Sequence, residues 1–412
     1  MKELLNKYIE KILIIFLYLQ PVIDLFTSIS LNVFHINISF GIVVRILFLL
    51  FLLYFYLFVK KNVFKKRKYY LLGVLLFLIA YSIMIINIKD ISALSYELQN
   101  VIKLFYLPVL LIIIDPKDIK IDYKDLVKIA FIYLIFISVP TILGLEFNSY
   151  TQGKTGSVGW FNSGNEISAI LSILTPFLIY YIFTKHNLFN KLFLVIIMGY
   201  TYFIIGSKII IISLVVSIIF NIILYFKNNK VNKNKILMYL GIAIVLLVIG
   251  IILIPKTNFY HNLVIHLNYL GINSVKDIFS YNFVNRFIFS DRLTYLSSTN
   301  LNYIWSKPIE KILGIGFIES FGTDYVYIKA IEMDFFDIFY RTGIIGFIII
   351  MIPIFMAIKN IFVKHYDKLI IFAIILGLII SMLVGHTLSS PGVAIYLIYL
   401  FKTKKTCIEV KR

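Results

Sequence analysis

The sequence contains one cysteine, Cys407, which lies in the basic C-terminal tail. No disulfide can therefore form within the chain, and no cysteine-ligated metal site exists. The sequence also lacks a glycine-rich phosphate loop of the nucleotide-binding type. Four histidines, His261, His266, His365 and His386, are scattered without the spacing of metal ligands. Nothing in the sequence requires a cofactor or a metal, and we expect neither.

Acidic residues are scarce, because 21 Asp and Glu stand against 40 Lys and Arg and give a formal net charge of +19. In a soluble protein this charge would suggest nucleic-acid binding. However, 60% of the residues are hydrophobic, whereas soluble chains average about 45–50%. The excess forms runs of roughly twenty residues, the length that crosses about 30 Å of hydrocarbon. Most basic residues cluster between these runs, so we expect a membrane protein with no nucleic-acid partner.

The apolar runs predict an all-α, polytopic transmembrane helical bundle of about 12 spans. The first run contains Gln20, Pro21 and Asp24 and has no small-residue cleavage pattern, which indicates a retained helix rather than a signal peptide. The seventh and twelfth runs are short, and the turn at 206–208 could instead lie inside a broken helix. The runs cover approximately residues 9–31, 38–59, 69–88, 96–114, 126–145, 165–184, 192–206, 208–226, 236–254, 335–358, 369–386 and 390–401.

The basic residues also predict the orientation of the chain. One set of loops, together with both termini, holds 27 of the 40 Lys and Arg. By the positive-inside rule this set is cytoplasmic, and so are both termini. We therefore divide the chain into four parts. These are transmembrane helices one to nine (1–254), a large extracytoplasmic loop with short helices (255–333), transmembrane helices ten to twelve (334–401) and a basic cytoplasmic tail (402–412). Within the large loop, residues 259–270 have the apolar spacing of a helix lying in the membrane interface.

Charged residues inside the apolar runs are candidates for function, because charge is costly in hydrocarbon. The runs contain Asp24, Arg45, Lys103 and Arg341. Asp24 and Arg45 could pair and hold the first two helices together. Alternatively, Arg45 and Lys103 could bind a lipid phosphate, since a guanidinium donates two parallel hydrogen bonds to phosphate.

The predicted outer loop before the sixth run is rich in glycine and carries aromatic and amide side chains. Asn165 is placed to cap the following helix, with Glu166 in its first turn, which is an ordinary helix start. In a functional reading, Trp160 packs at the interface, while Asn162 and Asn165 offer hydrogen bonds to a sugar.

The large loop carries Arg286 and Arg292, six residues apart, which could simply face solvent. Glu332 stands where the loop returns to the membrane, close to Asp334 and Asp337. Gly343 and Gly346, in the tenth run, fit close helix packing.

Four pieces of the chain resemble, in the same order, the O-antigen ligase and polysaccharide polymerase family. They are GWFNSGNEISAIL (159–171), IIGSKIIIISL (204–214), SDRLTYL (290–296) followed by GIGF (314–317), and Glu332 with Gly343 and Gly346. Ligases of the family have a His, a small polar residue, nine residues and then Gly-x-x-Gly. Here Glu332 takes the His position and Met333 the small polar position, which favours a polymerase over a ligase.

The resemblance implies a membrane glycosyltransferase of the bacterial cytoplasmic (inner) membrane, with its active site on the outer face. The donor would be an oligosaccharide repeat unit on undecaprenyl pyrophosphate, polymerised into a surface polysaccharide such as capsule. Membrane lipids, a flippase and a chain-length regulator would be its other partners. The reaction needs cations to stabilise the departing pyrophosphate and a base for the acceptor hydroxyl.

We assign the catalytic roles to Arg292, for the pyrophosphate, and Glu332, for the base. A carboxylate at a membrane boundary can have a raised pKa, and we expect this of Glu332. Glu332 could instead be an ordinary acid at a helix N-terminus. The remaining candidates bind substrate: Arg286, Lys208, Arg341, Arg45, Lys103, Asn162, Asn165 and Trp160.

Two other functions fit the sequence. A ligase of the same family would move finished glycan onto a different acceptor. A transporter or flippase for the lipid-linked glycan would suit twelve spans with intramembrane charges. Transport does not obviously require the 79-residue outer loop (255–333), which favours the enzyme.

Overall fold

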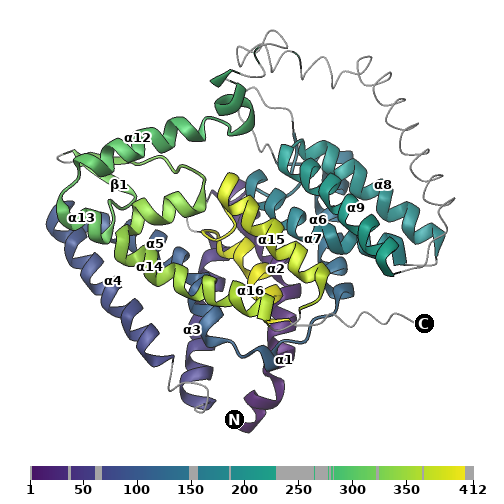
Figure 1. Cartoon of the computed structure of the whole chain (residues 1–412), viewed down its shortest axis with the longest axis horizontal. Coiled ribbons are helices and arrows are strands. Elements are labelled where there is room, and N and C mark those ends of the chain that lie inside the picture. Colours follow the sequence, from purple (N-terminus) through teal and green to yellow (C-terminus); the bar gives the residue numbers. More distant parts are fainter. Residues whose placement is uncertain are drawn as a thin grey trace.

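The computed structural model is a bundle of helices that covers most of the chain (Figure 1). It describes residues 2–35, 39–60, 67–147, 156–184, 187–228, 264, 277, 280–281, 283–321, 324–363 and 366–403. In these ranges eight helices are long and apolar enough to cross a membrane, and the bent pair formed by α1 and α2 could add a ninth span. The predicted all-α polytopic fold is confirmed.

The helices that build the bundle follow the predicted apolar runs closely. The ninth run, 236–254, and most of the predicted interfacial helix, 259–270, lie outside the described residues. Elsewhere each run becomes a helix, except that the first is divided by a bend of 46° before Gln20 and Pro21. The helices are α1 (Lys2–Tyr18), α2 (Gln20–Asn32), α3 (Phe40–Tyr54, extended by a π-helical turn, Phe55–Val59), α4 (Lys68–Ile88), α5 (Ile91–Ile113), α6 (Tyr123–Ile142), α7 (Gly164–Thr184), α8 (Leu188–Ile205), α9 (Lys208–Asn228), α14 (Asp334–Val363), α15 (Lys368–Leu383) and α16 (Pro391–Lys402).

The core of the bundle lies around α7 and α16. Helix α7 packs against α6, α8, α9, α15 and α16, and its residues 167–179 are buried throughout. Every residue of α16 is buried as well. A helix of this length rises only about 18 Å, which is too short to span a bilayer alone. The short helix α16 is nevertheless tolerated, because the non-helical backbone beside it is buried in protein and not exposed to lipid.

The described part of the predicted outer loop forms a small helical and hairpin unit on the bundle. Helices α12 (Arg292–Trp305) and α13 (Pro308–Leu313) precede a two-stranded antiparallel hairpin, β1 (Ile318–Phe321) and β2 (Asp324–Tyr327). Helix α13 packs on α4 and α14, and α12 contacts α14. In Figure 1 this unit lies along one end of the bundle, beside the start of α14.

A buried ion pair attaches this unit to the bundle. The Glu97 carboxylate, which is fully buried on α5, accepts hydrogen bonds from Lys89 Nζ (2.9 Å) and Tyr81 Oη (2.7 Å). It also accepts the backbone N–H groups of Phe317 and Ile318. A buried carboxylate is tolerated only when it is paired and hydrogen-bonded. Because those N–H groups belong to the loop, this pairing fixes the loop against α5.

The ends of the helices group as the charge pattern predicts. At one end Lys60, after α3, pairs with Asp118 at 2.6 Å, and Lys402, at the end of α16, donates to the Leu111 carbonyl. These residues belong to or adjoin the lysine-rich loops. The described parts of the loops poor in basic residues, among them Asn162, Ser163 and Glu332, line a cavity at the opposite end.

Candidate active site

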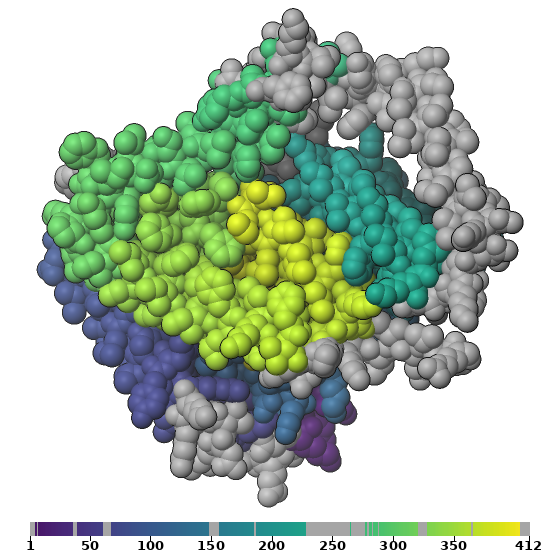
Figure 2. Space-filling view, viewed as in Figure 1, coloured from purple at the N-terminus to yellow at the C-terminus, as the bar shows by residue number. Residues whose placement is uncertain are grey.

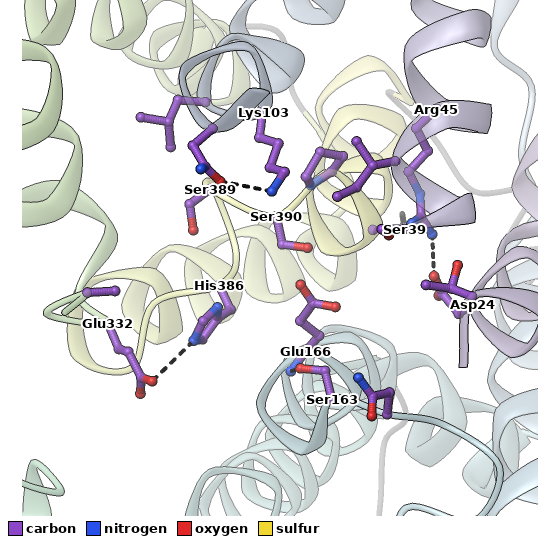
Figure 3. Close-up of a pocket in the computed structure, with 18 of the residues that line it drawn as sticks. Asp24, Ser39, Arg45, Lys103, Ser163, Glu166, Glu332, His386, Ser389 and Ser390 are labelled. Carbon is purple, nitrogen blue, oxygen red and sulfur yellow. Dashed lines mark hydrogen bonds and ion pairs between the residues drawn. The ribbon is translucent and has the colours of Figure 1, made fainter. Parts of the chain in front are cut away.

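A cavity of about 510 Å³ opens between the predicted outer ends of the helices (Figure 3). Its walls include residues from the first turns of α3, α7, α14 and α16. The N-terminus of a helix carries partial positive charge and unpaired N–H groups, so four such ends favour an anionic ligand. Two of the residues that precede these helices, Ser39 and Ser390, make no side-chain capping bond and line the cavity.

Arg45 lies at one side of the cavity and is held by neighbouring side chains. It pairs with Asp24 on α2 and donates Nε to Gln20 Oε1 at 2.9 Å. Asp24 also accepts a hydrogen bond from Tyr133 Oη on α6 at 2.7 Å. The pairing that the sequence suggested between the first two apolar runs is therefore confirmed. Arg45 still lines the cavity, with Gly392 of α16 directly against its guanidinium.

Lys103 faces the same space from α5 (Figure 3). Its ammonium group donates to Asn100 Oδ1 at 2.9 Å. Among the described residues this is its one hydrogen-bond partner, and an ammonium has three N–H donors. Lys103 is therefore placed to donate to an anion in the cavity.

Glu332 stands at the other side of the cavity in a cluster of polar groups. Its Oε2 accepts from Arg292 Nη2 at 2.7 Å and from Asn165 Nδ2 at 3.4 Å. Its Oε1 lies 3.8 Å from His386 Nε2. Burial raises the pKa of Glu332, but the contact with His386 and the charge of Arg292 outweigh burial and lower this pKa to about 2. The prediction that Glu332 has a raised pKa is wrong, because the sequence did not reveal the two cations beside it.

The pKa of His386 moves in the opposite direction. Burial lowers the pKa of this imidazole, but the contact with Glu332 and the charges of Glu166 and Asp334 raise it overall. His386 therefore tends to carry a proton and a positive charge in the cavity.

The first turn of α14 fixes the backbone at Glu332. The Asp337 carboxylate accepts the N–H groups of Ile331, Glu332 and Met333 at 2.8–3.3 Å. Glu332 has a φ of +61°, a left-handed conformation that is uncommon for residues other than glycine. Strained residues of this kind persist when surrounding bonds hold them. Asp337 supplies those bonds and so sets the direction of the Glu332 side chain.

Asp334, three residues earlier in the same turn of α14, fixes the loop between α15 and α16 in the same way. Its carboxylate accepts the N–H groups of His386, Thr387 and Leu388 at 2.7–3.0 Å. The hydroxyl of Ser389 donates to it as well. His386 also has a left-handed φ, +59°. One helix turn thus orients the two groups that meet in the cavity, Glu332 and His386.

A second carboxylate, that of Glu166, enters the cavity from the first turn of α7. Figure 3 shows it between Ser163 and Ser390, pointing into the open space. The described residues offer it no hydrogen bond or ion pair, although its charge acts on Lys103 and His386 across the cavity. The sequence suggested Asn165 as the cap of this helix. In the structure α7 begins at Gly164, and Ser163 Oγ accepts the Glu166 N–H instead.

Several candidates from the sequence lie away from the cavity wall. Arg292 is buried and contacts the cavity through Glu332. Arg286 is exposed, with Nε 4.0 Å from Asp291 Oδ1, and Lys208 is the first residue of α9; neither lines the cavity. Trp160 donates Nε1 to the Leu145 carbonyl and packs on Phe136.

Arg341 lines the cavity, but its guanidinium is engaged with the chain. It donates to the carbonyl oxygens of Gly316 (2.8 Å) and Lys329 (2.9 Å) and lies 3.8 Å from Asp337. These contacts stabilise the wall of the cavity and leave the guanidinium poorly placed to form two parallel hydrogen bonds with a ligand. Asn162 lines the cavity and accepts from Asn32 at 3.4 Å.

Sequence reasoning missed His386 and the positioning roles of Asp334 and Asp337. The apolar pattern counted His386 as the last residue of a span, so its loop was not recognised. The stretch Ser389–Ser390–Pro391 was a usable signal, because proline is favoured at the first turn of a helix. It would have ended the preceding helix earlier and exposed the histidine.

Comparison with known proteins shows the family of the chain. A family model described as "O-antigen ligase like membrane protein" matches residues 6–278 and 281–405. No curated protein sequence matches the chain. The match covers nearly the whole chain, including all of the cavity, and supports glycan transfer at a membrane.

Proposed function

Because the chain belongs to the O-antigen ligase-like family of membrane proteins, we propose that it polymerises undecaprenyl-pyrophosphate-linked oligosaccharide repeat units into a surface polysaccharide. The observation that carries this proposal is the cavity in which Lys103 and Arg45 face Glu166 and Glu332. Cations and carboxylates are the two kinds of group that the transfer needs. The protein would act in the bacterial cytoplasmic membrane with this cavity on the outer face, supplied by a flippase.

The reaction joins two glycans without a nucleotide sugar. A hydroxyl of the acceptor glycan attacks the anomeric carbon of the donor, and the bond from that carbon to the pyrophosphate oxygen breaks. The electron pair leaves with the lipid pyrophosphate, and the hydroxyl proton passes to a carboxylate. Fixed positive charge aimed at the departing oxygen lowers the barrier. Lys103, Arg45, protonated His386 and the four helix N-termini supply this charge.

The two carboxylates have different surroundings and therefore suit different roles. Glu332 is paired with Arg292, and its pKa of about 2 makes it a weak proton acceptor. We assign to Glu332 the task of keeping His386 protonated beside the leaving group, and to Arg292 the task of holding the Glu332 carboxylate in place. The Glu166 carboxylate makes no hydrogen bond or ion pair among the described residues and points into the cavity, which suits a base.

The test uses a strain that lacks the gene, complemented with variants whose membrane levels are checked. E166Q should reduce long-chain glycan by about 10²–10⁴-fold, the usual size of general-base catalysis. E332Q, R292A and K103M should also shorten the glycan. R286A is the matched control, because this arginine lies outside the cavity, and it should leave chain length unchanged. Wild-type chain lengths in all four cavity variants would contradict the proposed site.

One observation favours a ligase as the second candidate. The ligase pattern has a histidine where this chain has Glu332, and His386 brings an imidazole to within 3.8 Å of that carboxylate. A deletion strain separates the two functions. If it still makes long lipid-linked polymer but fails to attach it, the protein is a ligase; if only single repeat units accumulate, it is a polymerase.

A further inference from the structure

Helices α12 and α13 expose an apolar surface that the bundle does not cover. On α12, Leu301, Ile304 and Trp305 are exposed, and Trp305 is 84% exposed. Residues three and four apart lie on one face of a helix, so these three side chains form a single stripe. Ile309 and Ile312 extend it on α13. We call these five residues the α12–α13 patch.

The patch is continuous with the lipid-facing surface of the bundle. Helix α13 packs on α4 and α14, and the backbone of Ile312 lies against Gly343. The next residue of α14, Ile344, is itself exposed, as are Ile83 and Ile86 near the same end of α4. Figure 2 shows the green α12–α13 segment, the lime α14 and the blue α4 forming one surface without a gap.

The residues bordering the patch match the head-group region of a membrane. Lys307 and Lys311 adjoin it in sequence, and Lys307 is exposed. Tryptophan and lysine are enriched where a protein passes from hydrocarbon to water. By contrast, the first half of α12 exposes Thr294, Ser297 and Ser298, which suit water.

We infer that the α12–α13 patch inserts into the outer leaflet, with Trp305 at the level of the lipid head groups. Helix α12 then connects the membrane surface to the cavity, because its first residue, Arg292, forms the ion pair with Glu332. The insertion would hold this wall of the cavity at the depth where the phosphates of membrane lipids lie. The inference does not depend on which reaction the cavity performs.

The test exploits the presence of only two tryptophans in the chain. The W160F protein retains Trp305 alone and is placed in nanodiscs made with lipids brominated near the head group. We expect these lipids to reduce Trp305 emission about twofold, since an interfacial indole contacts that region. Aqueous iodide should have little effect.

Two variants of the W160F protein complete the experiment. Replacing Leu301 and Ile304 with glutamate should abolish quenching by the brominated lipids, because charge drives this face out of hydrocarbon. The matched control, S298E, adds charge to the polar half of α12 and should leave the lipid quenching unchanged. Strong iodide quenching of Trp305, with none from brominated lipids, would overturn the inference and show that the patch faces water.

Discussion

At the scale of single residues, the cavity depends on pairs that no local pattern reveals. Glu332 and His386 are 54 positions apart, yet their side chains meet at 3.8 Å. The sequence identified Glu332 from its place in a family pattern, but it did not identify the partner or the direction of the pKa shift. The ion pair between Asp24 and Arg45 was easier to predict, because two opposite charges in adjacent apolar runs would each be costly in hydrocarbon unless they paired.

The raised pKa of His386 predicts a pH dependence of ligand binding. Protonated His386 adds positive charge to the cavity, so undecaprenyl pyrophosphate should bind more weakly as the pH rises through the pKa of His386. In E332Q one neighbouring carboxylate is lost, so the pKa of His386 should fall and the decline should begin at a lower pH. Binding of undecaprenyl pyrophosphate to the purified protein, measured across pH, checks this.

H386Q provides the control for the pH experiment. It keeps a polar side chain of similar reach but cannot gain a proton, so the pH dependence in the neutral range should disappear. If H386Q declined with pH as the wild-type protein does, the charge of His386 would not contribute to binding.

At the scale of helices, the apolar periodicity predicted most of the bundle. Eleven of the twelve runs match described helices, and the ninth run, 236–254, lies outside the described residues. The turn at 206–208 is also confirmed, since Gly206 ends α8 in a left-handed conformation. The break between α1 and α2 was not foreseen, because it depends on the proline at the start of α2, which hydropathy does not register. The start of α16 was predicted to within one residue, since the twelfth run begins at 390 and the helix begins at Pro391.

Helix α14 contains a break that only glycine accommodates. Gly343 has φ +63° and ψ −171°, and a Cβ atom there would lie 2.5 Å from the Ile312 carbonyl oxygen. This combination of φ and ψ is essentially restricted to glycine, and the backbone strain of another residue held there costs about 1–3 kcal/mol. We therefore expect G343A to lower the apparent melting temperature in detergent and to weaken the packing of α13 against α14.

G73A is the matched control for G343A. Gly73 lies within α4, and no atom lies within 4 Å of a Cβ added there. Alanine favours a helix over glycine by about 0.5–1 kcal/mol, so the melting temperature should stay the same or rise. Equal losses in G343A and G73A would show that the break in α14 is not specifically required.

At the scale of the whole molecule, the account depends on orientation. The described residues of the lysine-rich loops, among them Lys60, Lys120 and Lys402, lie at one end of the bundle and the cavity at the other, so by the positive-inside rule we expect the cavity outside. Cysteine labelling tests this in a C407S background, where the chain has no other cysteine. S297C on α12 should react with a membrane-impermeant maleimide on intact cells.

The opposite end provides the internal control. Lys120 is exposed and forms only a surface ion pair with Glu10, so K120C should fold normally. It should react only after the cells are permeabilised. Labelling of K120C but not S297C on intact cells would reverse the orientation and place the cavity in the cytoplasm.

Glycan transfer is the reaction that the cavity is proposed to perform, and it can be observed directly. The purified protein in nanodiscs is given the lipid-linked repeat units that accumulate in a strain lacking the gene. The account predicts a ladder of lengthened lipid-linked glycan, with one undecaprenyl pyrophosphate released for each bond formed and a large loss of both in E166Q. Unchanged glycan length with no release of undecaprenyl pyrophosphate would contradict it.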